Sequence, residues 1–240
     1  MELGRIDIHV GVSMLSRYLA NPRKGHLDHV YHMFGYLKKV HQSKLVMDQD
    51  PIKWGNTFQG TDWSDFYPGA EDELPSGMPE PKGESVQINV FADADHAGDR
   101  VTRRSQSGII IFINKAPIIW FSKRQNTVEA STFGSEFIAL KQATELVKGL
   151  RYKLRMMGVP LEGPANVFCD NNSVVINAST PGSTLKKKHI AICYHMVREA
   201  AAANILRVAK ILGTKNLSDV LTMNLPGPQL RELCGKFMYR

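Results

Sequence analysis

The chain has 240 residues, enough for one large domain or two small ones, and 43% of them are apolar, so a sizeable core can form. Lys and Arg outnumber Asp and Glu by 30 to 23, and the formal net charge of +7 favours a polyanionic partner. The three cysteines form no CxxC motif, and the first residues lack the pattern of a signal peptide. No apolar run approaches the ~18 residues of a membrane span. We therefore expect an intracellular protein, in a cytoplasmic particle or the nucleus, that is neither secreted nor membrane-bound.

Residues 1–48 have the pattern of a helical segment. Apolar residues recur at spacings of three and four between residues 6 and 47, and Asn21-Pro22-Arg23-Lys24-Gly25 separates two helices. Residues 49–84 are instead rich in proline and glycine with acidic residues between them, which is typical of an irregular linker. We place the domain boundary there.

Residues 85–228 alternate strand and helix patterns, and residues 229–240 follow as a C-terminal tail. Strands are predicted at 86–93, 108–113, 118–121, 165–169 and 205–209, and helices at 132–157, 171–178, 188–203 and from about Asp219 onward. The first three strands are expected to be antiparallel neighbours. This order predicts an α/β fold in which helices flank a mixed five-stranded sheet.

Glu136 heads the apolar stripe of the long predicted helix. Steps of four and three from it meet Leu140, Ala143, Val147, Leu150 and Leu154. Burying an unpaired carboxylate costs several kcal/mol, so a cation or metal ion would be needed beside it. The alternative is that Glu136 lies in an exposed first turn and complements the helix dipole.

Asp93 and Asp170 each stand where a predicted apolar strand stops. Strand ends beside helix starts are where open α/β sheets build their sites. Helix capping is the alternative for Asp170, which precedes Asn171, and for Asp219, which follows Ser218. Asp95 and Asp99 are rivals of Asp93, but they fall beyond its strand, where a solvated turn explains them.

Asp93, Glu136, Asp170 and Asp219 all lie at edges of elements that one sheet could bring together. Carboxylates that converge on Mg²⁺ form the hard-ligand arrangement of divalent phosphoryl-transfer sites. Two ions roughly 3.5–4 Å apart can activate a water and stabilise the leaving oxygen. We therefore predict these four acids as catalytic residues and as ligands of two Mg²⁺ ions, with Mn²⁺ as an alternative metal.

Several short motifs follow one another at residues 93–99, 103–108, 119–125, 131–140, 168–171, 188–199 and 217–222. In content and order they resemble the ribonuclease H domain of copia-type retrotransposon polyproteins. The resemblance implies a ribonuclease H-like fold over 85–228 and assigns the catalytic acids of the family to the same four positions. It also implies hydrolysis of the RNA strand of an RNA·DNA hybrid. Gly134 stands where the family usually has a glutamate that completes a capping box, so the helix start is expected to fray.

Residues 12–17, 21–22 and 35–38 resemble the end of a copia-type reverse transcriptase, where helices belong to the thumb and connection. The polymerase motif Tyr-x-Asp-Asp does not occur in the 240 residues, so no polymerase activity is expected on this chain. The palm and fingers would be supplied by the same polyprotein or by another chain.

Basic and polar residues close to the acids in sequence are candidates for contacts with the phosphates of a hybrid. They are Arg103, Arg104, Ser105, Lys123, Arg124, Gln125, Asn171, Lys187, Lys188 and His189. A solvated surface is the alternative meaning of such residues.

Two functions remain open at this stage. One is an active metal-dependent endonuclease, and the other is an inactive retrotransposon remnant whose fold persists as a nucleic-acid-binding or structural module. A transposase or integrase on the same fold is disfavoured, because its glutamate is expected last in the chain and the order here is Asp, Glu, Asp, Asp.

Overall fold

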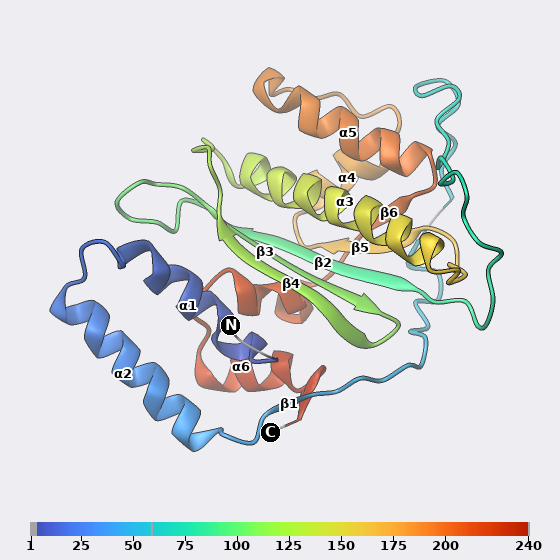
Figure 1. The fold of residues 1–240 in the computed structure, drawn as a ribbon. Coiled ribbons are helices and arrows are strands. Elements are labelled where there is room, and N and C mark those ends of the chain that lie inside the picture. Colours follow the sequence, from blue (N-terminus) through green and yellow to red (C-terminus); the bar gives the residue numbers. More distant parts are fainter. Residues whose placement is uncertain (1–3, 59, 240) are drawn as a thin grey trace.

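A mixed five-stranded sheet forms the centre of the computed structural model, which describes residues 4–58 and 60–239 (Figure 1). The strand order is β4-β3-β2-β5-β6, with bounds β2 Ile88–Asp95, β3 Gln106–Ile113, β4 Ala116–Arg124, β5 Ala165–Cys169 and β6 Leu206–Lys210. β3 is antiparallel to both β2 and β4, whereas β5 is parallel to both β2 and β6. The predicted fold class is confirmed.

Helices cover both faces of this sheet (Figure 1). One face carries α3 (Thr132–Met156), α4 (Asn172–Ser179) and α5 (Ala191–Ala202), and the other carries α1 (His9–Leu15), the 3-10 helix η5 (Leu217–Leu221) and α6 (Gly227–Cys234). The remaining elements are α2 (Lys24–Lys39), the 3-10 helices η1 (Ile6–Ile8), η2 (Ser16–Tyr18), η3 (Lys188–Ile190) and η4 (Gly213–Lys215), and the paired strands β1 (Lys44–Leu45) and β7 (Met238–Tyr239). No helix in the described part of the chain is long and apolar enough to cross a bilayer.

The sheet separates two hydrophobic cores, because successive residues of a strand point to opposite faces. In β2, Val90 and Ala92 belong to the core beneath α3, α4 and α5. Phe91 belongs to the second core, together with Phe237 near the C-terminus. Full burial of a large apolar side chain contributes roughly 1.5–3 kcal/mol, so both cores stabilise the sheet and fix its register.

α3 is buried along the stripe that the sequence predicted, with Leu140, Ala143 and Val147 fully buried. Its N-cap is Ser131, whose Oγ accepts a hydrogen bond from the backbone N–H of Gly134 at 3.2 Å. A Cβ at Gly134 would lie 2.5 Å from Oε2 of Glu129. The carboxylate of Glu129 thus occupies the space beside the first turn of the helix.

The end of the chain differs from the prediction. Asp219 lies in the short 3-10 helix η5, and α6 is a separate helix that begins after Pro226, because proline fits the first turn of a helix but not its interior. Residues 229–239 are not a peripheral tail. They form most of α6 and β7, and they bury Leu233 and Phe237 in the second core.

The described residues of 49–84, predicted as a linker, contain no helix or strand, but they pack against the sheet unit. Trp54 Nε1 donates a hydrogen bond to Oδ1 of Asn89 in β2 at 2.7 Å. Asp72 accepts hydrogen bonds from two arginines of α3 at 2.7 and 2.5 Å. We call this segment the strap.

Candidate functional site

Strand pairing brings Asp93 and Asp170 together. β2 and β5 are parallel, and Phe91 pairs with Phe168. The aspartates stand two residues further along each strand, so they meet at the same edge of the sheet. Asp93 lies within β2, and Asp170 directly follows β5.

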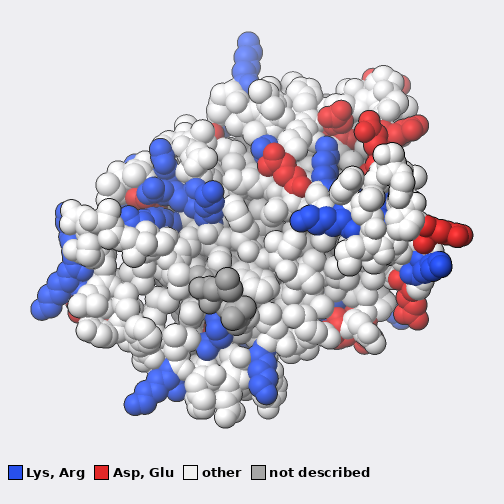
Figure 2. All heavy atoms as spheres, viewed as in Figure 1, with Lys and Arg blue, Asp and Glu red and all other residues white. Residues whose placement is uncertain are grey.

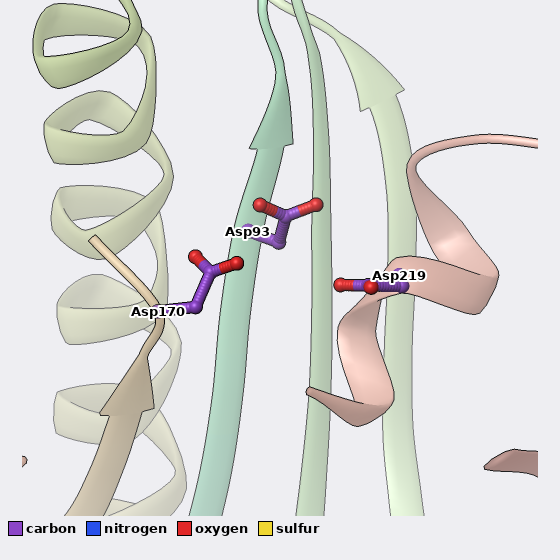
Figure 3. Close-up of side chains that lie close together, drawn as sticks. All are labelled: Asp93, Asp170 and Asp219. Atoms are coloured by element: carbon purple, nitrogen blue, oxygen red, sulfur yellow. The ribbon is translucent and has the colours of Figure 1, made fainter. Parts of the chain in front are cut away.

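Asp219 joins these two acids from η5, on the sheet face that also holds Phe91. One carboxylate oxygen from each of Asp93, Asp170 and Asp219 lies within 4.8 Å of the others. Figure 3 shows the three carboxylates turned toward a common space between β2, the end of β5 and η5. We call these three residues the aspartate cluster.

A glycine in β3 allows η5 to approach this closely. Gly108 is the residue opposite Asp93 in the antiparallel register of β2 and β3. A Cβ at Gly108 would lie 2.6 Å from Cγ2 of Thr222 and 2.8 Å from the carbonyl oxygen of Ser218. A side chain at this position would therefore push η5 away from the sheet.

Glu136 lies beside the aspartate cluster and is not one of its three members. Its Oε1 accepts a hydrogen bond from Nδ2 of Asn171 at 3.1 Å. Burial is the largest cause of its raised pKa, and the charges of Asp170 and Asp93 raise the pKa further, to about 7. The structure thus groups three of the four predicted acids and places the fourth within their electrostatic reach.

The aspartates themselves resist ionisation. Burial raises the pKa of Asp93 to about 6, although the hydrogen bond from Thr222 acts in the opposite direction. Burial and the charges of Asp93 and Asp170 raise the pKa of Asp219 to about 8. Burial also raises the pKa of Asp170, and Lys210 opposes that shift. Buried carboxylates whose pKa values are raised in this way repel one another, and the opposing charges are too weak to offset the burial.

The aspartate cluster has the donor set of a hard divalent cation. None of the ion pairs found among the described residues involves Asp93, Asp170 or Asp219. Carboxylate oxygens are the preferred ligands of Mg²⁺ and Mn²⁺. A bound dication would remove the mutual repulsion, so these residues fit the predicted metal.

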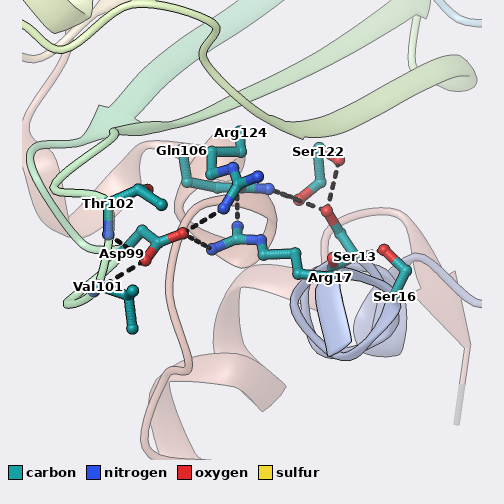
Figure 4. Close-up of polar contacts among 9 residues, drawn as sticks. All are labelled: Ser13, Ser16, Arg17, Asp99, Val101, Thr102, Gln106, Ser122 and Arg124. Atoms are coloured by element: carbon teal, nitrogen blue, oxygen red, sulfur yellow. Dashed lines mark hydrogen bonds and ion pairs between the residues drawn. The ribbon is translucent and has the colours of Figure 1, made fainter. Parts of the chain in front are cut away.

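The solvated-turn interpretation of Asp95 and Asp99 is wrong. Asp95 is the last residue of β2, and Asp99 is only 6% exposed. Oδ2 of Asp99 lies 2.6 Å from Nη1 of Arg124 and 3.5 Å from Nη1 of Arg17 (Figure 4). These arginines come from distant parts of the chain, so the local sequence gave no sign of them.

Two of the predicted nucleic-acid contacts are excluded by burial. Ser105 is fully buried, and its Oγ accepts a hydrogen bond from the backbone of Ala97. Gln125 is 2% exposed, and its Nε2 donates to Oγ of Ser107 and to the carbonyl oxygen of Ser135. The Ser105 side chain thus holds the loop after β2, and the Gln125 side chain joins the end of β4 to β3 and α3.

The other predicted contacts have different surroundings. Arg103, Lys123 and Lys188 are exposed side chains. Arg104 is half-buried, Arg124 pairs with Asp99, and Asn171 bonds to Glu136.

Two basic residues of the loop before α5 are tied to the start of α3. Lys187 donates a hydrogen bond to Oγ of Ser131, the N-cap of that helix. His189 Nε2 lies 2.9 Å from Oε2 of Glu129. The structure thus places basic side chains close to the helix that carries Glu136.

Sequence reasoning missed Thr222, although the residue is the last of the motif at residues 217–222. It is fully buried, and its Oγ1 donates a hydrogen bond to Oδ2 of Asp93 at 2.6 Å. One signal was available, since a glycine within a strand pattern marks a close approach of another backbone. That glycine is Gly108, but the approaching segment could not be read from the sequence.

Comparison with known proteins indicates what the chain is related to. No protein-family model matches it. It is 28% identical over 238 residues to the retrovirus-related Pol polyprotein from transposon TNT 1-94 of Nicotiana tabacum, which covers 99% of this chain and 15% of that protein. It is 29% identical over 155 residues to the Pol polyprotein from transposon RE1 of Arabidopsis thaliana, covering 65% of this chain and 11% of that protein. Its homologues are retrovirus-related Pol polyproteins of plant transposons.

The Pol polyprotein from transposon RE2 of Arabidopsis thaliana is 30% identical over 144 residues, which cover 60% of this chain and 10% of that protein. The chain therefore spans between about a tenth and a seventh of the length of these Pol polyproteins. Solved structures with a weaker likeness include LC11-RNase H1 in complex with an RNA/DNA hybrid, with a TM-score of 0.46 and 17% identity over 57% of this chain and 94% of that chain. An N-terminal RNase H domain from Mycobacterium tuberculosis has a TM-score of 0.44 and 14% identity over 63% of this chain and 98% of that chain.

Proposed function

We propose that this chain is the ribonuclease H region of a copia-type Pol polyprotein, a metal-dependent endonuclease that hydrolyses the RNA strand of RNA·DNA hybrids during reverse transcription. The observation that carries the proposal is the aspartate cluster, in which oxygens of three aspartates from separate elements lie within 4.8 Å of one another. Homology to Pol polyproteins supports the retrotransposon setting.

The residues that would hold the metal are Asp93, Asp170 and Asp219, with Glu136 beside them. Two Mg²⁺ ions, or Mn²⁺, would supply an activated water and stabilise the leaving oxygen. The raised pKa values mean that Asp219 and Glu136 hold protons near neutral pH until a cation lowers those values. Metal binding by this cluster would therefore release protons.

Charge is distributed unevenly over the face of the molecule that Figure 2 shows. In the view of Figure 2, basic side chains gather over the loop between β2 and β3 and over α2, whereas acidic side chains gather over the strap. Arg103 and Arg104 belong to that loop, and Lys123 lies near the end of β4. Phosphates of a hybrid would be attracted to the basic side, without recognition of base sequence.

The N-terminal helices would belong to the reverse transcriptase part of the polyprotein. The match to the TNT 1-94 polyprotein extends over 238 residues and so includes α1 and α2. We propose that the polymerase palm and fingers are supplied by the same polyprotein or by another chain, and that this chain does not polymerise.

Cleavage of a labelled RNA·DNA hybrid by the full 240-residue chain in Mg²⁺ tests the proposal. The variants Glu136→Gln and Asp170→Asn should abolish cleavage, while Glu145→Gln on the exposed side of the same helix should leave it unchanged. Hybrid binding without cleavage by the parent would instead support the inactive remnant. Cleavage that survives both active-site variants would contradict the assignment of the acids.

A further inference from the structure

Thr222 links two of the acids that would bind metal. Its side chain is fully buried, and Oγ1 donates a hydrogen bond to Oδ2 of Asp93 at 2.6 Å. The same hydroxyl lies 3.4 Å from the carbonyl oxygen of Asp219. A hydroxyl has one proton to donate, so the short contact with the carboxylate takes it. Charge-assisted hydrogen bonds of this length are stronger than neutral ones and hold the acceptor in one orientation.

The segment that carries Thr222 is fixed from two further directions. Oγ of Ser122 in β4 donates a hydrogen bond to the carbonyl oxygen of Leu221 at 2.6 Å. The absence of a side chain at Gly108 allows Thr222 and Ser218 to pack against β3. The backbone of residues 218–222 is therefore held against the sheet, and Thr222 reaches Asp93 from a rigid base.

We infer that Thr222 is a positioning residue of the metal site: its hydroxyl orients the Asp93 carboxylate and keeps it in register with Asp219. The inference rests on the proposed function, because it assigns Thr222 a role toward the metal that the aspartate cluster would bind. A hydrogen-bonded neighbour of a metal ligand commonly contributes about 10–100-fold to metal affinity or activity. The hydrogen bond from Thr222 would hold the Asp93 carboxylate in one orientation toward the metal.

Titration of the full chain with Mn²⁺, followed by the metal-dependent rise in Tm, tests this role without substrate. Thr222→Val removes the hydroxyl and keeps the shape of the side chain, whereas Thr222→Ser keeps the hydroxyl. Thr144→Val is the matched control, because Thr144 is also fully buried and its Oγ1 donates to the carbonyl oxygen of Leu140, in its own helix, at 2.9 Å. All three variants are compared with the parent in buffer that contains chelator before Mn²⁺ is added.

The Mn²⁺ midpoint of Thr222→Val should rise by about 10–100-fold, while Thr222→Ser and Thr144→Val stay close to the parent. In hybrid cleavage, Thr222→Val should lower kcat and leave KM for the hybrid unchanged. An unaltered Mn²⁺ midpoint in Thr222→Val would overturn the inference. An equal rise of the Mn²⁺ midpoint in Thr222→Ser would also overturn it, because that result would indicate a role in packing alone. A parent whose Tm does not respond to Mn²⁺ would overturn it as well.

The two proposals fail in different ways. A parent that binds Mn²⁺ but does not cleave a hybrid contradicts the endonuclease function, and the Mn²⁺ midpoints of the variants still decide the role of Thr222. A parent that cleaves while Thr222→Val has normal Mn²⁺ binding and normal kcat contradicts the role of Thr222 alone.

Discussion

Nη1 of Arg124 lies 2.6 Å from Oδ2 of Asp99, and this ion pair fastens the loop after β2 to the end of β4. Arg17 approaches the same oxygen from η2 at 3.5 Å, and it also donates a hydrogen bond to Oε1 of Gln106. Figure 4 shows these contacts together with those of Ser13, whose hydroxyl donates to the carbonyl oxygen of Ser122. The N-terminal helices are thus joined to the sheet by partly buried polar contacts beside the loop that bears Arg103.

Asp99→Asn should destabilise the protein by about 1–3 kcal/mol, because it leaves two arginine side chains without their partner charge. Asp48→Asn, which breaks an exposed pair with Lys115 at 3.2 Å, should change stability much less than Asp99→Asn does. Urea unfolding of the two variants and the parent measures the difference. Equal effects of the two substitutions would show that the buried pair does not hold the N-terminal helices to the sheet.

The pH dependence of the same pair follows from its pKa. Burial alone would raise the pKa of Asp99, but the backbone N–H of Thr102 and the guanidinium of Arg124 lower it well below the usual range. A carboxyl with a lowered folded-state pKa stabilises the fold above its unfolded pKa of about 3.9, and this stabilisation is lost as pH falls. Below pH 4, the free energy of unfolding of Asp99→Asn should therefore fall less steeply with decreasing pH than that of the parent.

The aspartate cluster should have the opposite pH dependence when metal is removed. Burial and the charges of Asp93 and Asp170 raise the pKa of Asp219 to about 8, so the folded state holds a proton that the unfolded state releases near pH 4. Stability in chelator should fall as pH rises from about 4 to about 8. Asp219→Asn should be more stable than the parent at pH 8 by on the order of 1 kcal/mol, after allowance for solvent screening.

Thermal melts at pH 5 and pH 8, with chelator or with Mg²⁺, measure this effect. Mg²⁺ should raise the Tm of the parent more at pH 8 than at pH 5, and it should raise the Tm of Asp219→Asn less. Glu145→Gln, at an exposed position of α3, should behave like the parent. A parent whose Tm in chelator is the same at both pH values would contradict the proposed repulsion within the cluster.

The sequence was sufficient to predict the parts of the site that depend on local pattern. The apolar stripe below Glu136 predicted the buried face of α3, and Asp170 directly follows β5 as expected, whereas β2 continues two residues past Asp93 to Asp95. Because β2 and β5 pair in parallel, these two aspartates lie close together. Each of these inferences needs only the period of a helix or the direction of a strand.

Contacts between distant segments could not be predicted from the sequence alone. Asp99 looked like a turn residue because its partners, Arg17 and Arg124, are far from it in the chain. Ser105 and Gln125 looked like phosphate contacts because polarity does not reveal whether a side chain points inward. Burial of polar groups is set by which elements pack together, and their partners are found only in the folded chain.

Arg198 should fix the loop that precedes α5. Its guanidinium donates hydrogen bonds to the carbonyl oxygens of Asn177, Thr180 and Pro181, and it lies 4.8 Å from the ring centroid of Trp63 in the strap. Arg198→Lys should destabilise the protein by about 1–3 kcal/mol, since an ammonium cannot reproduce this planar set of donors and leaves buried acceptors unpaired. Amide exchange in residues 180–188 should accelerate, and affinity for a hybrid should fall if the lysines of this loop contact phosphate.

Arg155→Lys is the control for that substitution. Arg155 pairs with Asp72 at 2.5 Å, and Arg151 binds the same carboxylate at 2.7 Å, so the replacement leaves Asp72 with a partner and should change stability by about 1 kcal/mol or less. Hydrogen exchange measured by mass spectrometry follows both variants. Unchanged exchange in the 180–188 loop of Arg198→Lys would contradict the proposed anchoring.

Gly108→Ala tests whether close packing of η5 against β3 assembles the aspartate cluster. The new Cβ would lie 2.8 Å from the carbonyl oxygen of Ser218 and 2.6 Å from Cγ2 of Thr222, so η5 must move away from the sheet. A shift of this kind in a packed core typically costs about 1–3 kcal/mol. The movement carries Asp219 away from Asp93, so cleavage of a hybrid should fall more than stability alone explains.

The same substitution at Gly149 should have the opposite sign. Gly149 lies in α3, and a Cβ there would meet no atom within 4 Å. Alanine is favoured over glycine in a helix interior, so Gly149→Ala should stabilise the protein by about 0.4–1 kcal/mol. Urea unfolding and hybrid cleavage of both variants are compared at a temperature where each is fully folded. If Gly108→Ala keeps parental activity there, the position of Asp219 does not depend on the glycine opposite Asp93.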